Sequence, residues 1–255
     1  MELVGARELL FAIASTSVRI RYKQSFLGIV WAVGQPLAQM ALFTLVFSVF
    51  AKVPSEGIPY PIFAYTALLP WTFFSTGISS AASSIVGNAA LITKIRLPTE
   101  VFPLGAIMAR LIDFGISSAI LLGMMLLYQV PPSVHMLWLI PLMVIQLLLM
   151  IAISLFLSAI NVFYRDINFA VGLVMQMWMF GSPVVYPISI VPERYQRFYM
   201  LNPMASILGS YRKALLQATI PDVGRLGWIL LVSIAILVVS YWFFKVQENK
   251  FADMV

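Results

Sequence analysis

Side chains able to carry acid–base or metal chemistry are few and scattered in this chain of 255 residues. It has no cysteine, and His135 is its only histidine, which excludes a cysteine nucleophile and a multi-histidine zinc site. Arg110 and Asp113 stand one helical turn apart inside an apolar stretch, where charged side chains pair or face water. They indicate either a mutual ion pair or a polar contact at the inner mouth of a pathway. Together with Arg165 and Asp166 they are too few to support a membrane-embedded transferase.

Energy coupling cannot come from this chain by the common routes. The phosphate-binding pattern G-x-x-x-x-G-K-[ST] does not occur in the sequence, so an ATP-driven process would need a separate ATPase. Asp113 is the only acidic residue well inside an apolar stretch, which argues against a proton-coupled carrier. The formal charge of +6 does not indicate nucleic-acid binding, because the basic residues are scattered between apolar stretches. In these positions they are typical of signals that set membrane topology and of contacts to anionic lipid head groups.

The composition predicts an all-α integral membrane protein, because 61% of residues are apolar and 10% are charged, against roughly 25% charged in soluble domains. A membrane-spanning helix needs about 20 mostly apolar residues, and the chain offers six such stretches. Pro131 and Pro132 separate the third from the fourth. We predict spans at residues 27–50, 62–84, 101–128, 136–160, 168–185 and 226–244 of one membrane domain. Charges within residues 1–28 argue against a cleavable signal peptide.

Two further segments flank these spans. Residues 1–25 predict an amphipathic helix at the membrane interface, or simply a basic anchor before the first span. Residues 186–225 hold several prolines and charges, and predict a re-entrant hairpin near a pore mouth or an amphipathic loop on the membrane surface. Placing both termini in the cytoplasm puts ten basic residues inside and six outside, which favours that orientation.

The loop at residues 88–98 is a candidate for docking a partner protein. Asn88 is suited to cap a short helix that Pro98 would end. Leu91, Ile92 and Ile95 would then form an apolar strip that could enter a groove of the partner, beside the basic Lys94 and Arg96. A plain connecting turn fits the same residues equally well.

Aromatic and glutamine side chains recur on the first and fifth predicted spans. Such a wall suits carbohydrate, because sugars pack on aromatic faces and glutamines in spanning helices prefer the bundle interior. Ordinary helix packing is the alternative interpretation. The residues are Trp31, Gln35, Gln39 and Phe43 on the first span, and Phe169, Gln176 and Phe180 on the fifth.

Five segments in order along the chain resemble motifs of one family. They are Arg21–Trp31 (RYKQSFLGIVW), Asn161–Ile167 (NVFYRDI), Ser182–Pro187 (SPVVYP), Leu201–Met204 (LNPM) and Phe251–Asp253 (FAD). In this combination the chain resembles the ABC-2 type permeases that export polysaccharides, most closely the membrane subunits of O-antigen exporters (Wzm type).

The resemblance implies a homodimer that forms a channel in the bacterial inner membrane, with the first and fifth spans as its lining. Two ATPase subunits of the Wzt type would bind ATP and Mg²⁺ and dock on a coupling helix at residues 88–98, while this chain holds no cofactor. The substrate would be a lipid-linked polysaccharide moved from cytoplasm to periplasm, past gate helices at residues 186–215. Residues expected at the gate or mouth are Tyr164, Arg165, Asp166, Pro183, Tyr186 and Tyr199. The motifs do not separate O-antigen from capsule or teichoic acid, and an exporter of small drugs or lipids is the other alternative.

Overall fold

The computed structural model describes residues 7–23, 30–94 and 97–254. Within these ranges the chain is helical with connecting turns and contains no strand, as the composition predicts. The long helices are α2 (Arg7–Lys23), α3 (Val30–Phe43), α4 (Tyr60–Ala82), α7 (Val101–Leu127), α8 (Leu139–Phe163), α9 (Ile167–Phe180), α11 (Pro203–Leu215) and α12 (Val223–Glu248). The short ones are η1 (Thr44–Phe50), α5 (Ser84–Gly87), α6 (Ala89–Ile92), η2 (Val134–Trp138), η3 (Ile188–Ile190), α10 (Glu193–Tyr199) and α13 (Phe251–Met254).

Among the described residues, four helical stretches are long and apolar enough to cross a membrane. They are Val33–Phe50, Val101–Leu127, Val134–Phe163 and Val223–Glu248. The first continues from α3 into the π-helix η1, and the third joins η2 to α8. These stretches overlap the predicted spans 27–50, 101–128, 136–160 and 226–244; residues 27–29 lie outside the described ranges.

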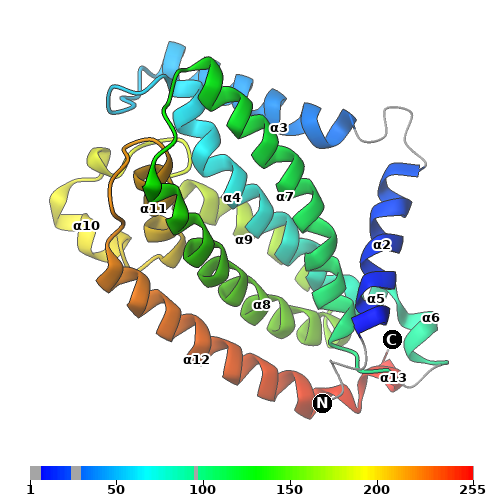
Figure 1. Ribbon diagram of the computed structural model, residues 1–255. Coiled ribbons are helices and arrows are strands. Elements are labelled where there is room, and N and C mark those ends of the chain that lie inside the picture. Colours follow the sequence, from blue (N-terminus) through cyan, green and yellow to red (C-terminus); the bar gives the residue numbers. More distant parts are fainter. Residues whose placement is uncertain (1–6, 24–29, 95–96, 255) are drawn as a thin grey trace.

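Helix α4 is the centre of the bundle and contacts α3, α7, α8, α9 and α11 (Figure 1). It corresponds to the predicted span 62–84, and 17 of its 23 residues are buried. Its serines and threonines lower its hydropathy, but a helix covered by protein on most sides does not need a lipid-compatible surface. Gln146 of α8 donates to the carbonyl of Pro70 at 2.8 Å and fixes α8 against the middle of α4.

Helix α9 ends earlier than the predicted span 168–185. It stops at Phe180, and 14 residues correspond to about 21 Å, less than the roughly 30 Å apolar core of a bilayer. The sequence after it, Gly181-Ser182-Pro183, explains the stop, because proline has no N–H for the helix ladder. Residues 181–187 instead run as an irregular segment at the end of the bundle.

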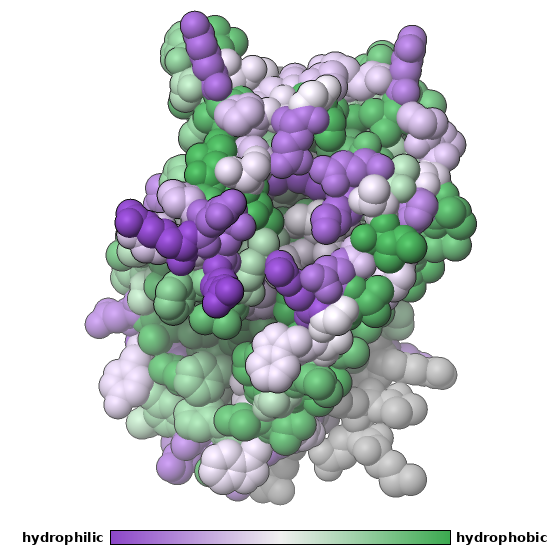
Figure 2. Space-filling model, turned by 90° about the vertical axis from the view of Figure 1, so that its left-hand side faces the viewer, coloured by the Kyte–Doolittle hydropathy of each residue, from purple (hydrophilic) through white to green (hydrophobic). Residues whose placement is uncertain are grey.

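The bundle has two distinct ends, which we name by their short helices. At the α13 end lie the start of α2, the end of α12, and α5 and α6; at the α10 end lie the 51–59 loop, α10 and α11 (Figure 1). Figure 2 looks onto the α10 side and shows hydrophilic residues gathered over its upper part. Exposed charged residues of this end include Lys52, Glu56, Glu193, Arg194 and Arg197.

Helix α2 packs along α7 through a close approach at one glycine. A Cβ added at Gly105 would lie 2.8 Å from Cγ2 of Ile13, so only glycine admits α2 at this distance. Ala14 is buried in the same contact region, while Leu10 and Ile13 are partly buried against the core. The predicted helix at residues 1–25 is therefore present over Arg7–Lys23, and residues 1–6 and 24–25 lie outside the described ranges.

Candidate functional site

The α10 end is organised around Arg212, a buried arginine on α11. Its side chain is 5% exposed, and its guanidinium donates four hydrogen bonds to backbone carbonyls. The acceptors are Phe63 of α4 at 3.2 Å, Pro183 at 2.6 Å, Val184 at 2.7 Å and Tyr186 at 3.3 Å. The guanidinium also stacks on the Phe63 ring, 3.7 Å from its centroid. Burial lowers the pKa of Arg212, but an arginine starts so far above neutral pH that it stays protonated.

The irregular segment after α9 has all its carbonyls satisfied. Every backbone carbonyl from 180 to 186 accepts a hydrogen bond, three of them from Arg212 and two from groups within the segment. Asn202 donates to the carbonyl of Gly181, and the Tyr60 hydroxyl donates to that of Val185 at 2.7 Å. Non-helical backbone near a membrane persists only when such partners exist. We call Tyr60, Asn202 and Arg212 the hub, because these three residues hold the segment in place.

Asn202 joins three elements through one amide. Its Oδ1 accepts from the backbone N–H of Met204 at 3.0 Å, which caps the start of α11, and from Nε1 of Trp178 on α9 at 2.8 Å. Its Nδ2 donates to the carbonyl of Gly181 at 2.9 Å and to Oγ of Ser182 at 2.8 Å. The SPVVYP and LNPM motifs, distant in sequence, are therefore bonded directly to each other.

Two tyrosines extend the hub toward α10. The Tyr199 hydroxyl donates to that of Tyr186 at 3.1 Å, and the Tyr186 hydroxyl donates to the carbonyl of Phe180 at 2.6 Å. Burial, together with the hydrogen bond that Tyr199 donates to Tyr186, raises the pKa of Tyr199, so its phenol remains a proton donor at physiological pH. α10 is thus tied to the end of α9 by a directed pair of hydrogen bonds.

The 51–59 loop is fastened to the same end by Glu56. Its Oε1 accepts from Oγ of Ser189 at 3.2 Å, and its Oε2 accepts from Nε2 of Gln217 at 3.0 Å. These two hydrogen bonds join the loop to η3 and to the residues that follow α11. This end is an assembly of irregular segments and short helices held by a few polar side chains.

A family model described as ABC-2 type transporter matches residues 8–216, which include α9, the irregular segment and the whole hub. The chain belongs to the ABC-2 type transporter family. It is 32% identical to the O-antigen export system permease protein RfbA of Myxococcus xanthus, over 100% of this chain and 98% of that protein. The RfbA permease of Klebsiella pneumoniae is 28% identical over 97% of this chain and 95% of its own. The polysialic acid transport protein KpsM of Escherichia coli is 20% identical over 91% and 90%.

The predicted channel residues of this ABC-2 protein divide by exposure. On α9, Phe169 is 82% exposed, and Gln176 and Phe180 are exposed as well. Trp31 and Gln35 of α3 are also exposed. These residues lie on surfaces that no other described part of the chain covers.

The rest of the predicted α3 wall turns inward. Gln39 is half-buried, and Phe43 is buried and packs edge-on against Phe47 at 5.9 Å between ring centroids. Phe43 belongs to the main core, so the predicted alignment of four residues along one face is interrupted there. Helix α4 contacts both α3 and α9, and so lies between the two predicted lining helices.

The predicted docking loop is shorter as a helix than expected. α6 covers only Ala89–Ile92, and the Asn88 side chain makes no capping hydrogen bond to it; its Nδ2 donates back to the carbonyl of Ser84 at 2.7 Å. Leu91 is exposed, whereas Ile92 packs against the core at the α13 end, so they do not form one exposed strip. Lys94 is exposed, and Ile95 and Arg96 lie outside the described residues.

The six residues predicted at the gate or mouth fall at opposite ends of α9. Tyr164, Arg165 and Asp166 form the exposed turn before α9 begins. The other three, Pro183, Tyr186 and Tyr199, belong to the segment and tyrosine pair at the far end of α9.

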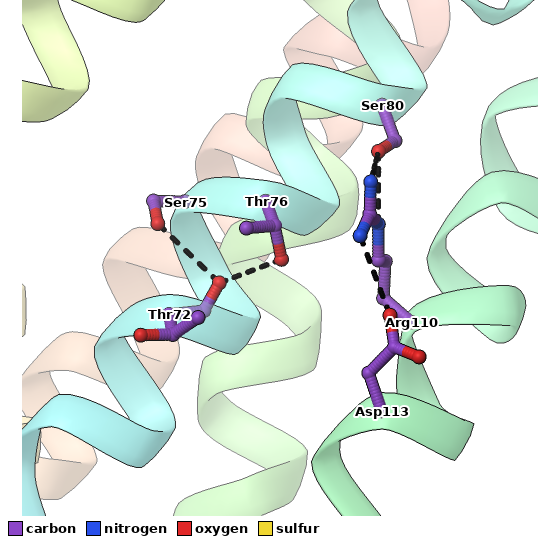
Figure 3. Close-up of polar contacts among 6 residues, drawn as sticks. All are labelled: Thr72, Ser75, Thr76, Ser80, Arg110 and Asp113. Atoms are coloured by element: carbon purple, nitrogen blue, oxygen red, sulfur yellow. Dashed lines mark hydrogen bonds and ion pairs between the residues drawn. The ribbon is translucent and has the colours of Figure 1, made fainter. Parts of the chain in front are cut away.

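Arg110 and Asp113 form the predicted ion pair, with 3.3 Å between Nη1 and Oδ2 and both side chains 24% exposed. Figure 3 shows Arg110 reaching from α7 to α4, where Nε and Nη2 donate to Oγ of Ser80 at 3.0 and 2.7 Å. Beside Ser80 lies a polar cavity of about 250 Å³ between α2, α5 and α7. The pair therefore ties α7 to α4 at the edge of a polar region.

Sequence reasoning missed the three hub residues. The topology prediction places Arg212 among the six basic residues outside the cytoplasm and assigns it no further role. Its position carried a signal, because Leu208 and Leu215 at i−4 and i+3 place it on the apolar face of α11, whereas Lys213 lies on the exposed face. An arginine on an apolar helix face must find acceptors inside the protein.

Proposed function

We propose that this chain is the channel-forming permease of an ABC exporter that moves lipid-linked polysaccharide of the O-antigen type out of the cytoplasm. Family membership and the full-length similarity to O-antigen export permeases support this assignment. A separate ATPase, of the Wzt type, binds ATP and Mg²⁺ and supplies the energy. Two copies of the chain and two ATPase subunits make up the transporter in the inner membrane, with the termini of the chain in the cytoplasm.

The observation that carries the channel assignment is the exposure of glutamines on two apolar helices. Gln35 of α3 and Gln176 of α9 are exposed among apolar neighbours. An amide facing lipid is unfavourable, so these surfaces face a second copy of the chain or a wet passage. Exposed rings at Trp31 and Phe169 lie on the same helices and offer stacking surfaces to sugars.

Six membrane crossings fit this function. Besides the four long apolar stretches, α4 crosses as the protein-covered centre, and α9 with the irregular segment crosses most of the bilayer before α10 and α11 turn back. The hub then keeps the re-entrant part closed at the periplasmic side. The α6 region faces the cytoplasm and is where the ATPase docks.

Cysteine accessibility tests the channel, since the chain has no native cysteine. We expect Phe169→Cys and Gln176→Cys, in membranes containing the full transporter, to react with a charged, water-soluble thiol reagent. Val238→Cys of α12 is the matched control: Val238 is 63% exposed in the protomer but faces lipid, and its thiol should not react. If none of the three thiols reacted with the reagent in any nucleotide state, a wet passage along α9 would be contradicted.

Reconstitution tests the transport assignment directly. Proteoliposomes with the permease and its ATPase should move lipid-linked polysaccharide in an ATP-dependent manner. Movement that continues unchanged without the ATPase, or none with both subunits present, would refute the proposal.

A further inference from the structure

A polar cluster at the α13 end joins the docking loop to the last long helix. Nζ of Lys245 on α12 lies 2.9 Å from the Glu100 carboxylate and 2.8 Å from that of Glu248. Oε1 of Glu248 in turn accepts from both the backbone N–H and the hydroxyl of Thr99, at 2.9 and 2.7 Å. Thr99 and Glu100 directly follow the docking loop at residues 88–98 and precede α7, which starts at Val101.

The cluster is built to stay closed. The Glu100 side chain is only 2% exposed, so separating it from Lys245 would leave a buried carboxylate without its cation. Leaving a buried charge uncompensated costs much more than an exposed pair is worth. Thr99 adds two hydrogen bonds to a charged acceptor, the stronger kind.

An apolar layer holds the other part of the loop to the same helices. Phe244 of α12 and Phe251 of α13 are fully buried, with their ring centroids 5.3 Å apart. They form one cluster with Ile85 of α5, and Ile92 of α6 packs against it. The loop thus rests on the end of α12 and on α13 both before and after its exposed tip.

We propose that Thr99, Glu100, Lys245 and Glu248 form a rigid joint that transmits movement of the docking loop to α12. This inference rests on the proposed function, because it requires an ATPase that moves the loop. Coupling between distant sites needs contiguous packed or hydrogen-bonded elements, and the joint gives the loop a second outlet besides α7. α12 packs along α8, so a push at the loop reaches the outer layer of the bundle.

The test breaks the joint and restores it covalently in the assembled transporter. Thr99→Cys and Glu248→Cys, singly or together, should leave ATP hydrolysis and ATPase binding in place. The polysaccharide exported per ATP should fall at least fivefold, the lower range of a coupling free energy. Cross-linking the double variant with a short bifunctional thiol reagent should restore export to within about twofold of the original chain, which has no cysteine.

Two further variants keep the test decisive. Lys250→Cys, at an exposed position outside the cluster, should export normally before and after the same reagent. Glu248→Gln keeps an acceptor for Thr99 but loses the charge facing Lys245, and should give an intermediate loss of polysaccharide exported per ATP. It replaces the double-cysteine variant as the test if that variant fails to assemble.

Unchanged export per ATP in the single variants would overturn the joint. So would a formed cross-link that restores nothing, or a parallel loss of ATP hydrolysis and export. Failure of the unmodified transporter to export would count against the proposed function instead.

Discussion

Replacing Arg212 by lysine tests the hub most directly. The substitution keeps the positive charge but replaces donors on three nitrogens by one ammonium. The four acceptors belong to two elements: one is the carbonyl of Phe63 on α4, and the other three are carbonyls of the irregular segment 181–187. An ammonium at one point cannot reach both elements, so we expect at least two buried carbonyls to lose their partner.

The magnitude follows from these counts. A buried acceptor left without a partner costs about 1–3 kcal/mol, and the planar stack on the Phe63 ring is lost as well. Arg212→Lys should therefore lower stability by about 3 kcal/mol in total. For a chain of this length that corresponds to a fall in Tm of roughly 6–12 °C.

The assay is thermal unfolding of the purified protein in detergent, followed by tryptophan fluorescence. Arg225→Lys is the matched control, because Arg225 pairs with Asp222 at 3.1 Å on the surface with both side chains about half exposed. Such pairs contribute about 0–1 kcal/mol, so its Tm should change by about 4 °C or less. If the Tm of Arg212→Lys fell no further than that of Arg225→Lys, the claim that these carbonyls depend on the guanidinium would be refuted.

Two further expectations concern the α13 end. Gly105→Ala should lower the Tm, because the new methyl would lie 2.8 Å from the β-branched Ile13 and displace α2; Gly115→Ala on the same helix has open space and should raise or preserve it. Equal shifts would show that α2 does not press on α7 there. Leu91→Asp should weaken co-purification of the ATPase without lowering the Tm, because Leu91 is exposed. The same change at the partly buried Ile92 should lower both, and undiminished ATPase binding by Leu91→Asp would place docking elsewhere.

Helix positions were largely predictable from the sequence, because a long uncharged stretch has few alternatives in lipid. α7 covers Val101–Leu127 against a prediction of 101–128, and the proline pair after it marks a real break before η2. Of the predicted docking loop, the sequence indicated the position in the chain but not the helix that forms there. An asparagine suited to cap a helix can also bond to the backbone of a neighbouring turn. Asn88 does this, because its side chain donates to the carbonyl of Ser84.

Sequence alone therefore determined that this is an all-helical membrane protein of the ABC-2 transporter type, whose sequence lacks the phosphate-binding pattern G-x-x-x-x-G-K-[ST]. Composition and local motifs carry that information. Tertiary structure decided which side chains join the elements. Arg212 of α11 bonds to the irregular segment, Asn202 links two motifs, and Lys245 of α12 pairs with Glu100 beside the predicted docking loop. These contacts join residues far apart in the chain, and a hydrogen bond depends on distance and direction in space, which spacing along a sequence does not contain.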